Sequence, residues 1–82
     1  MRAEYSDAVY AAIENAPQAV KKAFVKQIKL LEQNLRHPSL RAKKFDEAND
    51  RWPARVNQGW RFYFTIKGDT YHILSLISHP KK

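Results

Sequence analysis

Apolar and polar residues alternate with a period of two through the middle of the chain. Over 60–67 every even position is apolar, from Trp60 to Ile66, and every odd position is polar or amphipathic. The segment 52–57 continues the same alternation. A period of two is typical of a strand with one buried face and one solvent face. The pattern therefore predicts two half-buried strands.

The residues between these strands, Asn57-Gln58-Gly59, predict a hairpin turn. In a three-residue loop Gly59 takes the left-handed conformation, which glycine adopts without a steric penalty. The apolar side chains then share one face, and three pairs stand opposite each other: Val56 and Trp60, Ala54 and Phe62, Arg55 and Arg61. A two-residue turn would set Arg55 against Phe62 and mix the faces, so we expect the three-residue loop.

The two arginines that face each other on the polar side of this hairpin need a physical explanation. Like charges directly opposite across a sheet are destabilising. One interpretation is that an anion sits between Arg55 and Arg61. The other is that both guanidinium groups extend into water or pair with Asp50 or Glu47. The pattern leaves both interpretations open.

A glycine and an aspartate at 68–69 predict a second tight turn, followed by a last strand over 70–79. Simple pairing across this turn sets three further pairs opposite each other: Arg61 and Leu76, Tyr63 and Leu74, Thr65 and His72. Strict alternation places His79 on the same face as Ile73 and Ile77, away from the arginines. A bulge or the end of the strand would be needed to turn His79 toward them.

The N-terminal half of the chain has the spacing of helices. Ser6 is a favourable N-cap for a short helix over 6–15, and Pro17 ends that helix and begins the next, over 17–36. The second helix carries an apolar stripe with spacings of three and four: Val20, Phe24, Ile28, Leu31 and Leu35. Lysines at 21, 22, 26 and 29 lie away from the stripe, either as a solvated face or as part of a binding surface.

The remaining segments complete the predicted fold. Residues 40–45 have the pattern of a strand with three cations: Arg41, Lys43 and Lys44. Residues 1–5 add an optional edge strand. Helices that gather on one face of an antiparallel sheet define a two-layer α+β fold. We therefore expect one domain over 1–82, with an N-terminal helical hairpin packed on a three- to four-stranded antiparallel sheet.

Composition narrows the range of functions. The 82 residues carry 15 lysines and arginines against 8 acidic residues, and the net charge of +7 favours a polyanionic partner such as nucleic acid or an acidic protein. There is no cysteine and the three histidines lack ligand spacing, so we expect no metal site and no cofactor. No apolar run is long enough to span a membrane, and we expect a cytoplasmic protein without a membrane partner.

Several short motifs together are similar to those of the RelE/ParE toxin superfamily of bacterial toxin–antitoxin systems. In chain order they are Leu35 to Lys44, Trp52 to Val56, Gly59 to Phe64 and the terminal Ser78-His79, so the resemblance covers nearly the whole chain. It implies a RelE-like fold and, in the RelE branch, a type II toxin that inhibits translation as a ribosome-dependent mRNA endoribonuclease (an mRNA interferase). The implied partners are a cognate antitoxin, mRNA on the ribosome and, through the antitoxin, operator DNA.

The resemblance also implies roles for particular residues. Arg55, Arg61 and His79 match catalytic positions: the arginines would hold the phosphate under attack, and His79 would serve as acid or base. The implied RNA-binding residues are Arg41, Lys43, Lys44 and Tyr63. Tyr63 would either stack on a base or pack against Leu74.

Two other functions stay open. A ParE-like protein would inhibit DNA gyrase without being an enzyme, and that branch does not need Arg55, Arg61 or His79. A weakly active module would act by binding its antitoxin and, together with it, DNA as a corepressor. Pro53 keeps this third interpretation open, because active members often carry a basic residue at that place.

Overall fold

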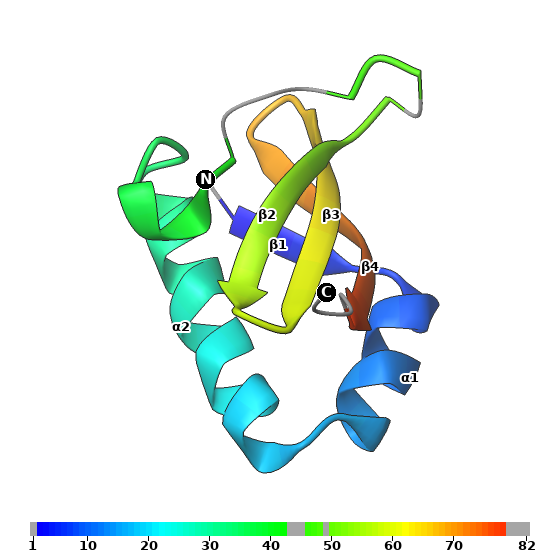
Figure 1. Cartoon of the computed structure of the whole chain (residues 1–82). Helices are drawn as coiled ribbons and strands as arrows, with labels where there is room; N and C mark the ends of the chain where they lie inside the picture. The colour runs from blue at the N-terminus through cyan, green and yellow to red at the C-terminus, as the bar shows by residue number, and fades with distance from the viewer. Residues whose placement is uncertain (1, 43–45, 49, 79–82) are drawn as a thin grey trace.

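The computed structural model describes residues 2–42, 46–48 and 50–78. Its elements, in chain order, are β1 (Arg2–Tyr5), α1 (Asp7–Asn15), α2 (Gln18–Gln33), the short 3₁₀ helix η1 (Pro38–Leu40), β2 (Trp52–Asn57), β3 (Trp60–Lys67) and β4 (Thr70–Ser78) (Figure 1). Three predicted site residues, Lys43, Lys44 and His79, lie outside the described residues. Within the described ranges, none of the helices has the length and hydropathy needed to cross a membrane.

The four strands form one sheet in the order β1-β4-β3-β2. The hairpins β2–β3 and β3–β4 are antiparallel, as predicted, whereas β1 runs parallel to β4. Parallel pairing needs a long crossover, and the helices and strands between β1 and β4 supply it. The two-layer α+β fold with two N-terminal helices is therefore confirmed, on a mixed sheet rather than a wholly antiparallel one.

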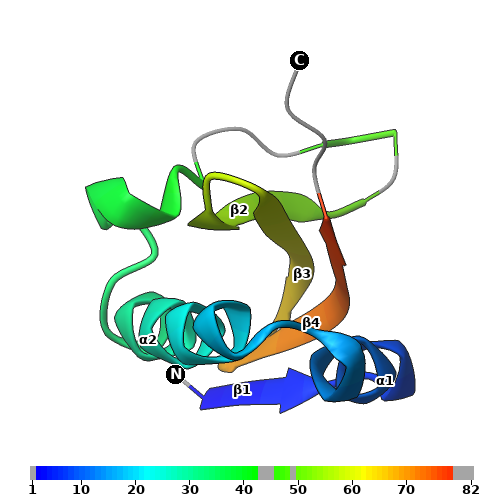
Figure 2. The same ribbon diagram turned by 60° about the horizontal axis from the view of Figure 1, so that its bottom comes forward.

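Both helices pack on the sheet and enclose one core. α1 contacts β4 and α2 contacts β2, and Figure 2 shows α2 lying within the curve of the sheet. Phe62 and Phe64 of β3 are fully buried, and the ring of Phe24 from α2 meets Phe62 edge to face with 5.5 Å between centroids. Burial of a ring of this size stabilises the fold by about 2–3 kcal/mol.

The helices begin and end near their predicted positions, with two corrections. Ser6 caps α1 as predicted, since its Oγ accepts a backbone N–H of the first turn at 3.3 Å. Pro17 is the N-cap of α2 rather than its first helical residue, and α2 ends at Gln33 instead of residue 36. The early end follows from Asn34, whose side-chain oxygen accepts the Arg36 N–H at 3.0 Å and so favours a turn. The predicted stripe of α2 is buried at Val20, Phe24, Ile28 and Leu31.

The β2–β3 hairpin confirms the predicted arginine pairing but has a different turn. Two pairs stand opposite each other as expected: Ala54 with Phe62, and Arg55 with Arg61. Asn57, rather than Val56, pairs with Trp60, so the expected three-residue loop is wrong. The turn is instead made by Gln58 and Gly59.

A side-chain hydrogen bond explains this shorter turn. The Asn57 Oδ1 accepts the Gly59 N–H at 2.9 Å, which closes an Asx turn in which Gly59 does not need the left-handed conformation that we expected. The pairing shifts between Arg55 and Asn57, and Val56 is the extra residue of a β-bulge. The bulge keeps Val56 buried and the arginines opposite each other, although the turn is one residue shorter than predicted.

A second bulge, at Leu74 of β4, changes the pairing of β3 with β4. Close to the turn the prediction is confirmed, since Thr65 lies opposite His72. Beyond the bulge two predicted pairs are wrong: Tyr63 stands opposite Ser75 rather than Leu74, and Arg61 stands opposite Ile77 rather than Leu76. The residues of β4 after the bulge are therefore displaced by one position relative to β3.

The start of α1 occupies this second bulge. The Ser6 Oγ donates a hydrogen bond to the Leu74 carbonyl at 2.8 Å, and the Ser6 N–H donates to the Ile73 carbonyl at 3.0 Å. Ile73 is buried, whereas Ile77 is 45% exposed and stands opposite Arg61. The expectation that Ile73 and Ile77 share one face is thus wrong, because the bulge reverses the alternation between them.

The prediction of a strand over 40–45 is wrong for residues 40–42, the part of this segment that the structure describes. The helix η1 occupies its start, and Arg41 follows with φ 52° and ψ 33°, in the left-handed region. His37 caps η1 by accepting the Ser39 N–H on Nδ1 at 3.1 Å, and a proline at the first helical position has the required φ. These local preferences make a tight turn instead of an extended segment.

Candidate anion-binding pocket

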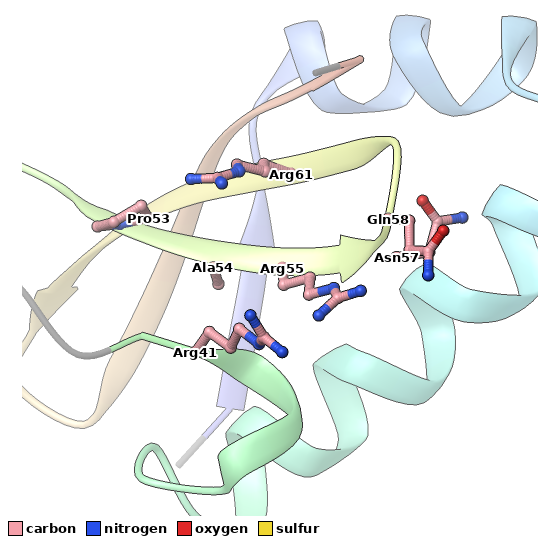
Figure 3. A pocket seen from close by; sticks show the side chains of 7 residues that line it. All are labelled: Arg41, Pro53, Ala54, Arg55, Asn57, Gln58 and Arg61. Atoms are coloured by element: carbon pink, nitrogen blue, oxygen red, sulfur yellow. The ribbon is translucent and has the colours of Figure 1, made fainter. Parts of the chain in front are cut away.

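An open pocket of about 390 Å³ lies between the β2–β3 hairpin and the segment that follows η1. Figure 3 shows the side chains that line it: Arg41, Pro53, Ala54, Arg55, Asn57, Gln58 and Arg61. Three of these are arginines, and they come from three different segments of the chain. Two of the predicted catalytic residues and one predicted RNA-binding residue therefore line one hollow.

Arg55 and Arg61 reach the pocket from facing positions on β2 and β3. Arg55 is half-buried and Arg61 is exposed. In Figure 3, Arg55 points into the space near Arg41, whereas Arg61 extends along the sheet toward Pro53. The two side chains thus cover both ends of the hollow rather than one point in it.

The arginines of the pocket have no acidic partner in the part of the chain that the structure describes. The ion pairs found there join Arg2 to Glu4, Arg51 to Asp46 and His72 to Glu4. The predicted alternative, in which Arg55 or Arg61 pairs with Asp50 or Glu47, is therefore not formed. Uncompensated cations that line a concave surface raise the positive potential inside it and favour an anionic ligand.

Arg41 enters the pocket from a backbone conformation that is unusual for its residue type. A residue other than glycine rarely has positive φ, because its Cβ crowds the backbone, and the conformation costs about 1 kcal/mol or more. The Arg41 side chain is also exposed, so its own burial does not stabilise this conformation. Such strain is common at functional sites, and here it directs a guanidinium group toward Arg55 (Figure 3).

Behind the pocket lies Gln27 of α2, a polar residue that is 97% buried, with 3% of its surface exposed. Its Nε2 donates to the carbonyls of Ser39 at 3.0 Å and Arg55 at 2.8 Å, and its Oε1 accepts the Ser39 hydroxyl at 3.2 Å. Sequence reasoning missed this residue. The signal was available, because position 27 lies three residues after Phe24 and four before Leu31, on the buried face of the helix.

Tyr63 lies beside the pocket rather than in it. It stands opposite Pro53 on β2 and Ser75 on β4, so the predicted packing against Leu74 is displaced by the bulge. The Arg51 guanidinium lies over the Tyr63 ring, 4.0 Å from its centroid, and also approaches Asp46 at 3.7 Å. One face of the ring is therefore occupied by a cation–π contact. Arg51 had not been predicted to contribute to this face of the sheet.

The chemistry of this surface is that of fixed positive charge. Guanidinium groups remain charged at all physiological pH values and donate paired hydrogen bonds to phosphate oxygens. Among the described residues, no group of three or more His, Cys, Asp or Glu side chains is placed to hold a metal ion. The pocket is suited to a phosphate or another oxyanion.

No protein-family model matches the sequence, and no curated protein matches it either. Solved structures do match the fold. A YoeB/ParE toxin from Agrobacterium tumefaciens superposes with a TM-score of 0.81 at 10% sequence identity, over 98% of this chain and 100% of that one.

Two complexes of toxins with their antitoxins are also similar. The archaeal RelE–RelB complex from Pyrococcus horikoshii matches with a TM-score of 0.81 at 19% identity, over 99% of this chain and 97% of that one. The RelBE toxin–antitoxin complex from Escherichia coli matches with a TM-score of 0.68 at 10% identity, over 98% of this chain and 96% of that one. The chain therefore has the fold of the RelE/ParE toxins, which confirms the resemblance seen in its sequence at the level of the fold.

Proposed function

We propose that this protein is the toxin of a type II toxin–antitoxin system and that it cleaves mRNA on the ribosome. One observation carries the proposal. On a RelE/ParE fold, Arg41, Arg55 and Arg61 line a single open pocket and have no carboxylate partner among the described residues. A pocket of this kind is suited to hold the phosphate of an RNA backbone.

The proposed reaction transfers the phosphoryl group to the neighbouring ribose hydroxyl. A base removes the proton of the 2′-hydroxyl, its oxygen attacks phosphorus, and the 5′ oxygen leaves with a proton from an acid. The strand is cut with a cyclic phosphate on one end and a hydroxyl on the other. Arg55 and Arg61, which lie at the two ends of the hollow in the free protein, would turn toward the phosphate and stabilise the negative charge that builds up on the phosphorus oxygens, and His79 would act as the acid or the base.

The same proposal assigns binding roles around this centre. Arg41 would hold the backbone from the side of η1, Tyr63 would offer the free face of its ring to a base, and Lys43 and Lys44 would add positive charge. The structures of RelE bound to RelB support a cognate antitoxin as partner. Contact with operator DNA through that antitoxin, and a location in the cytoplasm, belong to the same proposal.

One observation favours a second candidate, a weakly active module that acts through its antitoxin and DNA. Pro53 lines the pocket at the end toward which Arg61 extends, and a proline supplies neither charge nor a hydrogen-bond donor there. Inhibition of DNA gyrase without catalysis is the third outcome that an experiment must separate from these two.

The decisive experiment is brief induction without an antitoxin, followed by mapping of mRNA ends on translating ribosomes. Cleavage at codons in the ribosomal A site, lost in Arg61→Ala and in His79→Ala, is the expected result. Arg2→Ala is the matched control, because Arg2 is an exposed arginine on β1 that pairs with Glu4 and does not line the pocket. Growth arrest with intact mRNA would overturn the proposed nuclease activity. The supercoiling activity of DNA gyrase would then be the next measurement. Normal growth with intact mRNA would favour the weakly active module.

A further inference from the structure

Gln27 connects the two walls of the arginine pocket. One wall is β2, which carries Arg55, and the other is the η1 turn, which carries Arg41 two residues after Ser39. The Gln27 amide group is hydrogen-bonded to the backbone of both walls, since its Nε2 donates to the Ser39 carbonyl at 3.0 Å and to the Arg55 carbonyl at 2.8 Å. Its oxygen is also satisfied, by the Ser39 hydroxyl at 3.2 Å.

The walls need such a connection because two forces act to separate them. Arg41 and Arg55 are both positively charged and have no acidic partner among the described residues, so they repel each other. The left-handed backbone at Arg41 also stores strain that an opened turn would release. A second hollow, lined by Gln27, Ser39, Arg41 and Arg55 among others, continues the pocket toward α2, so there is room for the walls to move.

We propose that Gln27 is a positioning residue, which holds the Arg41 turn against Arg55 so that both guanidinium groups are ready for one phosphate group before RNA binds. This inference rests on the proposed function of the pocket and adds the group that preorganises it. A ligand site whose cations are already in place loses less freedom on binding and so binds more tightly. Buried amide groups that are fully hydrogen-bonded hold such geometry well.

The test uses Gln27→Met in the whole protein, because methionine fills the same volume without donating hydrogen bonds. The probe is a short single-stranded 2′-O-methyl RNA, which cannot be cleaved by attack of its own hydroxyl, and its affinity is measured by fluorescence anisotropy at low salt. We expect binding about tenfold weaker, because the Arg41 wall is then no longer held in place and must be ordered when RNA binds. The Arg41 backbone amide should also shift in the NMR spectrum.

Ile28→Val is the matched control. Ile28 is the next residue of α2 and is buried, but it does not line either hollow. We expect this variant to lose stability while its affinity for the probe and its Arg41 resonance stay unchanged. A role of Gln27 in general stability would instead make both variants behave alike, with normal affinity in the folded fraction.

A double-mutant cycle separates positioning from other effects. In an Arg41→Ala background Gln27→Met should cause no further loss of affinity, because the side chain that it positions is gone. Additive losses, or full affinity in Gln27→Met alone, would overturn the inference and leave the proposed function standing. If Arg41→Ala, Arg55→Ala and Arg61→Ala all bind the probe like the natural protein, the pocket is not the RNA site, and both proposals fail.

Discussion

The two faces of the β2–β3 hairpin contribute to the stability of the fold in opposite ways. On the inner face Ala54, Phe62 and Phe64 are buried, and their side chains pack against α2 and one another. On the outer face Arg55 and Arg61 stand opposite each other without an acidic partner in the described residues. The same alternation therefore produces a stabilising surface on one side and a mutually repelling one on the other.

This difference teaches which side of the sheet is free to serve function. Buried aromatic residues lower the free energy of the folded state, so their places are explained by folding alone. Facing arginines raise that free energy slightly, so folding does not explain them. Substitutions on the two faces should accordingly separate stability from binding.

The largest effect on stability is expected from the inner face. Phe62→Ala removes a fully buried ring that contacts Phe24, and we expect the free energy of unfolding to fall by about 3–5 kcal/mol. Urea denaturation followed by tryptophan fluorescence measures the change. A loss below about 1 kcal/mol would mean that this face is not the core.

The turn that joins β2 to β3 should give a smaller change, in both stability and RNA binding. Asn57→Ala removes the acceptor of the Gly59 N–H, and we expect a loss of about 1 kcal/mol together with weaker RNA binding. Asn57→Asp keeps the acceptor, so stability should be largely retained. Because Asn57 lines the pocket, the added negative charge should still weaken binding, and equal affinity in Asn57→Asp would contradict the site.

Arg41→Gly should make the contrast sharper by changing stability and binding in opposite directions. Glycine takes positive φ without strain, so we expect a gain in stability of about 1 kcal/mol at this position. The lost guanidinium should weaken RNA binding. Thermal unfolding and probe affinity measured on one preparation test both, with Arg41→Ala as the variant that loses the charge but keeps the strain.

The smallest change in stability is expected at Arg61. Arg61→Ala removes an exposed side chain and relieves repulsion with Arg55, so the free energy of unfolding should move by less than about 0.5 kcal/mol. Its effect should appear in binding: the slope of log affinity against log salt should fall by about 0.7, the value for one phosphate contact on a single strand. An unchanged slope would place Arg61 outside the contact surface.

Sequence reasoning predicted the alternating strands and the arginine pair because one face of the hairpin is strictly apolar. It failed on β4 because that strand has no such alternation. Ile73, Leu74, Leu76 and Ile77 are all apolar, so the pattern there fits either register and does not mark the bulge. The hydrogen bonds that Ser6, far away in the chain, donates to the Ile73 and Leu74 carbonyls favour the observed pairing, and the pattern of β4 does not reveal them.

The site was predictable in its charges and not in its architecture. Arg55 and Arg61 were found from the hairpin pattern, whereas Arg41 was assigned to a strand that does not form. Its left-handed turn depends on η1, which His37 caps through a side-chain contact that no periodicity reveals. Gln27 could have been recognised as a polar residue at a buried helix position, but its bonds to the two walls required the tertiary structure.

The parallel pairing of β1 with β4 has a consequence for how the chain is made. Residues 2–5 pair with residues 70–73, so β1 cannot take its place in the sheet until that later segment has been made. All the helices and the other strands of the sheet are synthesised between these two events, and such long-range contacts form slowly. Until β4 has emerged from the ribosome, β1 is therefore a strand without its partner.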